Sequence, residues 1–193
     1  MQNRRTSLFT LGLLVLTLSV FVAAQAPAAT YKGDPAHSTI LFKAKHMNTG
    51  YVFGRFNNFT AQVNYDEASP ESLSVESTVQ VDSIDTGIDK RDGHLKGPDF
   101  FSAKEFPTIT FKSKSAKSAG DDKFEVAGDL TLHGVTKPVT IVLEKTGAST
   151  KMGERVGWLS TFTVKRSDFG MTFMPEGVSD EIELTVSMET VKG

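Results

Sequence analysis

Apolar and polar residues alternate along most of the chain after residue 30, and a two-residue period of this kind predicts β-strands. In one such stretch Ile40, Phe42 and Ala44 share one face, while Lys43 and Lys45 lie on the other. Eight stretches follow this pattern, at residues 38–46, 59–65, 73–81, 109–113, 124–132, 135–143, 156–164 and 182–188. We therefore expect antiparallel strands with one buried face and one face in water.

Turn-forming residues separate these stretches. The clearest turn signals are at residues 66–70, 118–122, 133–134 and 146–153. Residues 88–96 (IDKRDGHLK) do not alternate, and Gly97 and Pro98 follow them. We predict one short helix or two turns there. No internal repeat or linker divides the chain, so residues 30–193 are predicted to form one domain.

Eight strands leave two sheet edges that must be covered, and a closed barrel removes both of them. The other solution is a two-layer sandwich with a filled core. The expected strands, at about 10–12 residues, are longer than the usual 5–6, which favours the barrel. The predicted fold class is all-β, an eight-stranded antiparallel barrel with one short helical insertion.

The first 29 residues differ from the rest of the chain. Arg4 and Arg5 precede an apolar stretch at residues 8–22, and small residues follow it. This is the arrangement of a secretory signal peptide, with cleavage expected after Ala24, Ala28 or Ala29. The alternative is an uncleaved anchor, but the stretch is shorter than the roughly 20 apolar residues of a spanning helix. We predict export to a bacterial periplasm, with no stable membrane insertion after cleavage.

Composition and charge exclude several kinds of function. The 193 residues include no cysteine, which excludes disulfides, thiolate metal sites and a cysteine nucleophile. Residues 1–29 hold two of the 21 Lys and Arg residues and none of the 23 Asp and Glu residues, so the remainder carries a net charge of −4. No strongly basic face is expected, so we predict no binding to nucleic acid.

Catalytic and metal-binding signatures are missing from the sequence. The four histidines, His37, His46, His94 and His133, are far apart along the chain. A metal site would have to be assembled across strands, and we interpret the histidines as structural. We expect no metal and no cofactor.

Four motifs follow one another in a characteristic order. They are HSTILFKAKH at residues 37–46 with GRF at 54–56, KRDGHLK at 90–96, GDLTLHGVTKPV at 128–139, and RSDFGM at 166–171. In this order and spacing, from about residue 31 to residue 188, the chain resembles the YceI-like family of periplasmic lipid-binding proteins.

The resemblance implies a lipocalin-like barrel with an elongated apolar interior. It implies a long isoprenoid or similar amphiphilic ligand, such as a polyprenyl chain or a quinone tail. It also implies a homodimer and no chemical reaction. The G-x-W signature of true lipocalins is missing, so that comparison concerns shape alone.

Phenylalanine supplies most of the candidate ligand contacts. Its ring has no polar tip and can line a dry cavity without an unsatisfied donor. The predicted aromatic lining is Phe42, Phe53, Phe56, Phe59, Phe100, Phe101, Phe106, Phe111, Trp158, Phe162, Phe169 and Phe173, with Met171 and Met174 as flexible additions. The alternative is that these rings pack a filled core.

The polar residues of the motifs are candidates for contact with a ligand head group. We predict this role for His46, Arg91, His94 and Arg166. The alternatives are structural, with Arg91 or Arg166 pairing with an aspartate and His46 buried and neutral. Two other functions stay open, an enzyme that acts on a lipid head group through His46, His94, Asp92 or Arg166, and a secreted β-sandwich interaction module without a cavity.

Overall fold

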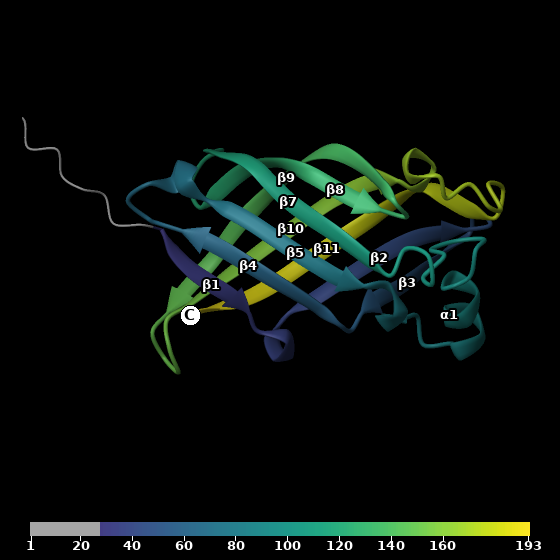
Figure 1. Cartoon of the computed structure of the whole chain (residues 1–193), viewed down its shortest axis with the longest axis horizontal. Coiled ribbons are helices and arrows are strands. Elements are labelled where there is room, and N and C mark those ends of the chain that lie inside the picture. Colours follow the sequence, from purple (N-terminus) through teal and green to yellow (C-terminus); the bar gives the residue numbers. More distant parts are fainter. Residues whose placement is uncertain (1–27) are drawn as a thin grey trace, which may run out of the picture.

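The structure, a computed structural model, describes residues 28–193, and residues 1–27, with most of the predicted signal peptide, lie outside the described residues. Figure 1 shows a single sheet wrapped around a long axis, with the helix at one end. The strands are β1 (Ala29–Gly33), β2 (Thr39–His46), β3 (Gly50–Phe56), β4 (Phe59–Tyr65), β5 (Ser74–Gln80), β6 (Ile84–Asp85), β7 (Thr108–Ser118), β8 (Lys123–Leu132), β9 (Val135–Ser149), β10 (Arg155–Lys165) and β11 (Val178–Lys192). The helix is α1 (Asp89–Leu95), and the short 3-10 helices are η1 (Pro35–His37), η2 (Pro70–Ser72), η3 (Val81–Ser83) and η4 (Arg166–Phe169).

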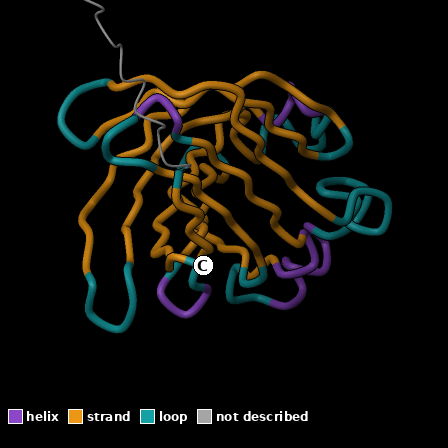
Figure 2. The backbone as a smooth tube through the Cα atoms, turned by 60° about the vertical axis from the view of Figure 1, so that its left-hand side comes forward, coloured by secondary structure: helices purple, strands orange, loops and turns teal. Residues whose placement is uncertain are grey.

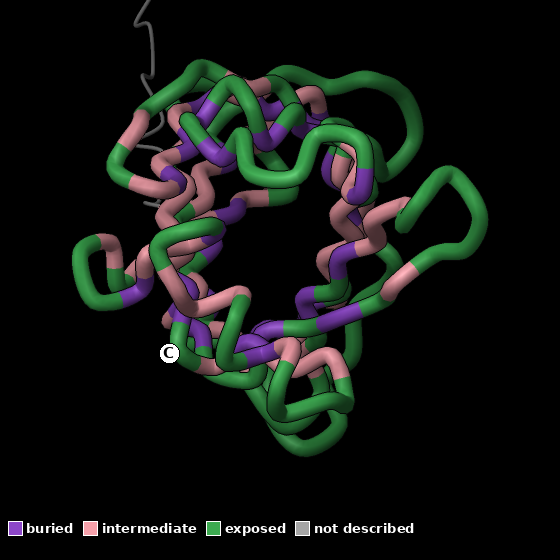
Figure 3. The backbone as a smooth tube through the Cα atoms, turned by 90° about the vertical axis from the view of Figure 1, so that its right-hand side faces the viewer, coloured by how far each residue is buried: buried purple, intermediate pink, exposed green. Residues whose placement is uncertain are grey.

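The sheet closes on itself. Strands β4, β5, β7, β8, β9, β10 and β11 are neighbours in that order, and β1 pairs with both β4 and β11. Past short breaks, β2, β3 and β6 continue β1, β4 and β5, and β2 pairs with the other half of β11. Eight antiparallel strands, three of them interrupted, therefore form a closed barrel, which Figure 3 shows end-on. The predicted barrel is confirmed, and the sandwich alternative is wrong.

The structure shows why β1, β3 and β6 were not predicted. Pro35 cannot donate to a sheet ladder and begins η1, which separates β1 from β2. β3 carries Tyr51 and Phe53 on its outer face and Gly54 on its inner face, which obscures the expected alternation. β6 has two residues, too few for any pattern.

The barrel has two different ends. The α1 end carries the β2–β3 turn, residues 86–107 with α1, and the β10–β11 connection (Figure 1). The distal end carries the β4–β5, β7–β8 and β9–β10 connections and the C-terminus. Figure 2 brings the distal end forward and shows the loops that join the strands.

The predicted helix and most turns are confirmed. α1 lies within residues 88–96, and the β8–β9 turn is formed by His133 and Gly134, both with positive φ, as a two-residue hairpin requires. The turn signal at 146–153 starts too early, because β9 continues to Ser149. A register shift opposite Gly157 and Trp158 lets β9 and β10 stay paired through this stretch.

Two inward-facing glycines make room for aromatic rings. A Cβ on Gly54 would lie 2.2 Å from Cζ of Phe42. A Cβ on Gly128 would lie 2.6 Å from the backbone oxygen of Lys112 and 2.8 Å from Cζ of Phe111. A glycine inside a strand often marks such a close approach.

We expect Gly128→Ala to lower the free energy of unfolding by about 1–3 kcal/mol, the usual cost of overpacking. Backbone as well as the Phe111 ring would have to shift. Chemical denaturation measures the change. Gly50→Ala is the matched control, since a Cβ on Gly50 meets nothing within 4 Å. Equal stability of the two variants would contradict this account.

Asp34 anchors the break between β1 and β2. Its carboxylate lies 3.0 Å from Nδ1 of His37 and accepts hydrogen bonds from Arg155 and the backbone N–H of Ala36. These bonds, that of His37 foremost, lower the pKa of Asp34 from 3.8 to about 2. The ionised carboxylate therefore stabilises the folded chain above pH 3.8, and this contribution is lost as the pH falls through 2.

We expect Asp34→Asn to be less stable than the unmodified chain by a constant amount between about pH 4 and about pH 5.5, where the carboxylate is ionised and His37 is protonated in both states. The difference should shrink towards pH 2, the folded-state pKa. Urea denaturation at a series of pH values measures it. Asp121→Asn is the control, because Asp121 is exposed. A difference that does not depend on pH below 4 would refute the assignment.

Candidate functional site

Three adjoining cavities run from the α1 end into the barrel. The first, the mouth, has a volume of about 180 Å³ and is lined by Phe42, Ala44, Lys45, His46, Val52, Arg91, His94, Leu95, Phe100, Met174 and Val178. The second, the outer chamber, has about 120 Å³ and is lined by Phe42, Ala44, Phe56, Leu95, Phe100, Phe101, Ile109, Leu130, Leu132, Phe162, Val164, Arg166, Met171, Val178, Ile182 and Leu184. The third, the inner chamber, has about 110 Å³ and is lined by Ile40, Ala61, Val63, Val75, Ser77, Val79, Ile109, Phe111, Leu130, Ile141, Leu143, Trp158, Ser160, Phe162, Leu184, Val186 and Met188. Shared lining residues show that the three cavities adjoin one another along one path from the mouth to the distal end, with side chains between them.

Two polar side chains of the inner chamber, Trp158 and Ser160, are hydrogen-bonded to the protein. Nε1 of Trp158 donates to Oγ1 of Thr190 at 3.1 Å, and Oγ of Ser160 donates to the backbone oxygen of Val142 at 2.8 Å. Among the described residues, no buried side-chain nitrogen or oxygen lacks a partner. The outer chamber therefore offers an apolar surface, and the inner chamber adds the hydroxyl groups of Ser77 and Ser160 to a wall that is otherwise apolar.

Arg166 is the one charged residue of the outer chamber, and only 5% of it is exposed. Its guanidinium donates to the backbone oxygens of Met171, Val178 and Ser179 at 2.8, 3.0 and 3.1 Å. Burial lowers its pKa below the ordinary value for arginine. The partners of Arg166 are thus carbonyl groups of the β10–β11 connection and of the first residues of β11, instead of the aspartate considered as its structural partner.

The segment around α1 closes the same end. Leu95, Phe100 and Phe101 turn inward, and the ring of Phe101 meets that of Phe56 edge-on at 5.8 Å. The segment is fastened by Arg91, whose Nε donates to Oγ1 of Thr86 at 2.7 Å and whose Nη2 donates to the Thr86 backbone oxygen at 2.7 Å.

Asp92 accepts from the backbone N–H of Thr86 at 2.9 Å and from the Thr86 hydroxyl. It is buried, as few aspartates are. Asp92 and Arg91 therefore hold the turn before α1.

Polar and apolar groups meet at the mouth. His46 and Met174 are exposed there, while Arg91 stands at the inner edge with Leu95. His94 lies 2.9 Å from Asp99 and packs edge-on against Phe100 and Phe173, at 5.1 and 5.7 Å between ring centres. The mouth thus offers imidazole and guanidinium groups beside apolar surface.

Aromatic rings seal the barrel at the distal end. Tyr65 lies edge-on to Trp158 at 5.3 Å and to Phe124 at 5.9 Å. We call these three residues the aromatic floor. Trp158 faces the inner chamber, whereas Tyr65 faces a separate polar hollow outside it.

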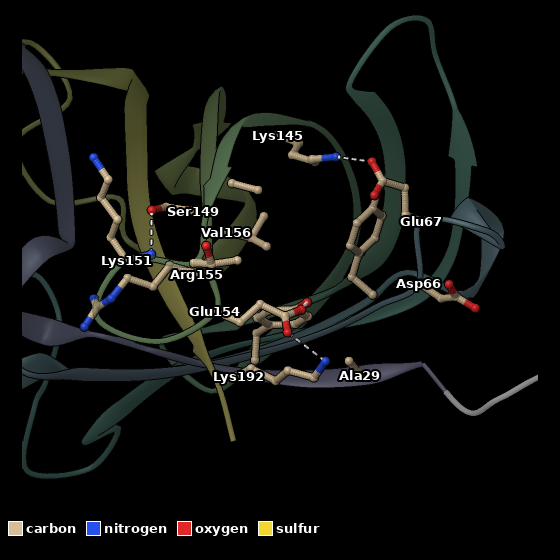
Figure 4. Close-up of a pocket in the computed structure, with 14 residues that line it drawn as sticks. Ala29, Asp66, Glu67, Lys145, Ser149, Lys151, Glu154, Arg155, Val156 and Lys192 are labelled. Atoms are coloured by element: carbon tan, nitrogen blue, oxygen red, sulfur yellow. Dashed lines mark hydrogen bonds and ion pairs between the residues drawn. The ribbon is translucent and has the colours of Figure 1, made fainter.

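The polar hollow has a volume of about 700 Å³ and is shown in Figure 4. Lys145 reaches Glu67 at 3.0 Å, and Lys192 reaches Glu154 at 2.9 Å. Glu154 also accepts from the hydroxyl of Tyr31 at 2.6 Å, and burial together with this bond raises the pKa of Tyr31 to about 12. The hollow is a network of ion pairs and does not share lining residues with either chamber.

One group of potential metal ligands occurs among the described residues, namely Asp34, His37 and Glu189. Nη1 of Arg155 bonds to the carboxylates of both Asp34 and Glu189. An arginine therefore already neutralises the carboxylates on which a cation would depend.

Most of the predicted site residues line the three cavities. These are Phe42, His46, Phe56, Arg91, His94, Phe100, Phe101, Phe111, Trp158, Phe162, Arg166 and Met174.

Four predicted residues do not line the cavities. Phe53 is 62% exposed, because its position opposite Lys43 turns it to the outer face of the sheet. Phe59 and Phe169 are buried within the packed core, and Phe173 packs on the rim beside His94. Of the two other residues proposed for the lining, Met171 lies on the outer chamber, while Phe106 packs on His133 at 4.7 Å.

The lining residues that the prediction missed in the two chambers are mostly aliphatic or small. Ile109, Leu130 and Leu184 line both chambers, and small side chains such as Ala61 and Ser77 line the inner one. All of them lie on the alternating faces noted in the sequence. The alternation was thus a sufficient signal, and selecting aromatic residues from it was too narrow.

The family model of the YceI-like domain matches residues 31–190 of this chain. The chain belongs to the YceI-like family. A UPF0312 protein of Pseudomonas aeruginosa is 38% identical over 187 residues, covering 95% of this chain and 97% of the relative. One from Vibrio vulnificus is 36% identical over 181 residues, covering 93% and 95%.

Solved structures share the fold of this YceI-like protein. Burkholderia cenocepacia BcnA superposes with a TM-score of 0.76 at 27% identity, covering 81% of this chain and 98% of that one. Campylobacter jejuni YCEI protein has a TM-score of 0.68 at 31% sequence identity, covering 77% of this chain and 90% of that one. A polyisoprenoid-binding domain from Saccharophagus degradans has a TM-score of 0.65 at 14% sequence identity, covering 86% of this chain and 99% of that one. At that identity, the structural likeness shows the fold alone. Within residues 28–193, no helix has both the length and the apolarity to cross a membrane.

We expect Arg166→Lys to lower the free energy of unfolding by about 3 kcal/mol, since buried carbonyl groups lose their partners. A lysine cannot reproduce the planar fork of donors. Urea denaturation measures the loss, and Lys165→Gln, at the exposed neighbouring position, is the control. A loss of only about 0.5 kcal/mol, as at ordinary surface sites, would show that the three bonds do not hold the connection.

Proposed function

We propose that this YceI-like protein binds a long isoprenoid chain, such as a polyprenyl chain or a quinone tail, or a similar amphiphile. The apolar tail would occupy the two chambers, and the head group would stay at the mouth. The observation that carries the proposal is the row of three adjoining cavities from the α1 end to the aromatic floor, of which the two inner ones are apolar. The name of the structural neighbour from Saccharophagus degradans, a polyisoprenoid-binding domain, supports the same ligand class.

The two ends of the barrel support this orientation. The mouth joins the outer chamber through Phe42, Ala44 and Leu95, and it carries His46 and Arg91 for a phosphate or quinone oxygen. The distal hollow is separated from the inner chamber by Tyr65 and Trp158. Beyond the mouth, a tail that enters from the α1 end meets a mainly apolar surface.

Binding requires the interior to widen. Each chamber is smaller than the roughly 300–1,000 Å³ of typical ligand pockets. The lining side chains can rotate and open the path without breaking the barrel, because the hydrogen bonds that hold the barrel together join the strand backbones. Burial of the tail then contributes about 25 cal/mol per Å² of apolar surface, less the ordering of the chain.

Several parts of the proposal extend beyond the cavity. The signal-like residues 1–29 support a role as a periplasmic carrier or buffer. The polar groups of Asp92 and Arg166 are committed to structural bonds, which favours binding over a reaction at a head group. A homodimer, expected from the family resemblance, would give twice the chain mass in light scattering.

The test of binding starts with the native ligand. The protein is purified from its own host and extracted with organic solvent, and the extract is weighed by mass spectrometry. We expect an isoprenoid lipid in stoichiometric amount. No such lipid, together with no affinity for added solanesol, would refute the proposal.

A substitution in the path provides an independent test. Ala44→Phe fills the junction between the mouth and the outer chamber, and we expect roughly tenfold weaker binding of solanesol, equivalent to 1.4 kcal/mol. Thr163→Leu, on the exposed face of β10, is the control and should bind like the unmodified protein. Equal affinities of both variants would place the ligand elsewhere.

A further inference from the structure

The inner chamber is a separate compartment at the end of the apolar path. It shares only Ile109, Leu130, Phe162 and Leu184 with the outer chamber. These side chains form a narrow boundary between two cavities of about 120 and 110 Å³. A tail that stops before this boundary leaves the inner chamber empty, whereas a longer tail must push between these residues.

The far side of the inner chamber is closed. Trp158 is 2% exposed, and its Nε1 bond to Thr190 fixes the indole in place. Oγ1 of Thr190 in turn donates to the backbone oxygen of Val156 at 2.9 Å. Tyr65 packs against the indole from outside, and Lys145 lies over the Tyr65 ring at 5.4 Å. A tail therefore cannot pass into the polar hollow without moving this buried aromatic floor.

One wall of the inner chamber is made of small residues. Ala61 on β4 and Ser77 on β5 are directly opposite each other across the two strands, and both face inward. Larger side chains at these two positions would occupy the compartment without entering the outer chamber, because neither residue lines it. The space in the inner chamber thus depends on two substitutable positions.

We infer that the inner chamber makes the affinity depend on the length of the ligand's apolar tail, and that the aromatic floor sets the upper limit of that length. This inference rests on the proposed binding of an isoprenoid from the α1 end. Short tails occupy the mouth and the outer chamber. Longer tails gain affinity by filling the inner chamber, until the tail meets Trp158.

The single tryptophan of the chain provides a direct readout. Trp158 lines the inner chamber and does not line the outer chamber or the mouth. We expect geraniol to displace a bound apolar dye without changing the emission of Trp158, and solanesol to displace the dye and change the emission. Geraniol that alters the emission as much as solanesol, or solanesol that leaves it unchanged, would overturn the inference.

The affinities of variants provide a second test of the dependence on tail length. Ala61→Leu and Ser77→Leu fill the inner chamber, and we expect each to weaken solanesol roughly tenfold with little effect on geraniol. Thr60→Leu, exposed and adjacent to Ala61 in the chain, is the matched control. Tyr65→Ala opens the floor and should raise the affinity for solanesol relative to geraniol.

The outcomes separate the inference from the proposal on which it rests. No binding of any isoprenoid alcohol to the unmodified protein refutes the proposed function itself. If both alcohols bind and Ala61→Leu weakens both equally, only the inference that affinity depends on tail length is refuted. Thermal unfolding of each variant shows that it is folded, and if Tyr65→Ala does not fold, Ala61→Leu and Ser77→Leu decide the matter.

Discussion

The pairing of β1 with β11 is the interaction on which the rest of the molecule depends. Tyr31, Lys32 and Gly33 lie opposite Lys192, Val191 and Thr190, and the same short strand pairs with β4 on its other side. Without this pairing, the distal part of β11 and one side of β1 would be open sheet edges, because β2 pairs only with the other half of β11. Closure makes the inward-facing side chains a single interior, shielded from water along its whole length.

Closure also determines how the two ends differ. The distal end carries ion pairs such as Lys145 with Glu67 above an aromatic floor, so polar groups remain outside the sealed interior. At the α1 end, residues 86–107 fold inward with Leu95, Phe100 and Phe101. One end is thus closed by packed rings, and the other by a segment attached through a few hydrogen bonds. This asymmetry gives the cavity a direction.

The polar residues of the four sequence motifs mainly shape this mouth. Arg166 holds the β10–β11 connection through backbone oxygens, and Arg91 and Asp92 hold the turn before α1 through Thr86. Burial of these charged side chains without such partners would be energetically unfavourable. His46 and His94 remain at the surface, where they are available to a head group.

The sequence by itself determined most of the strands, the short helix and most of the inward-facing residues, because successive side chains of a strand point to opposite faces whichever strands become its neighbours. It could not decide closure, because β1 and β11 lie at opposite ends of the domain. Nor could it place aromatic rings along the barrel. Phe53 faces outward only because of its register with β2, and Trp158 marks the end of the cavity only because Tyr65, distant in sequence, packs against it. Tertiary structure decided these points, since they depend on which strands become neighbours and in what register.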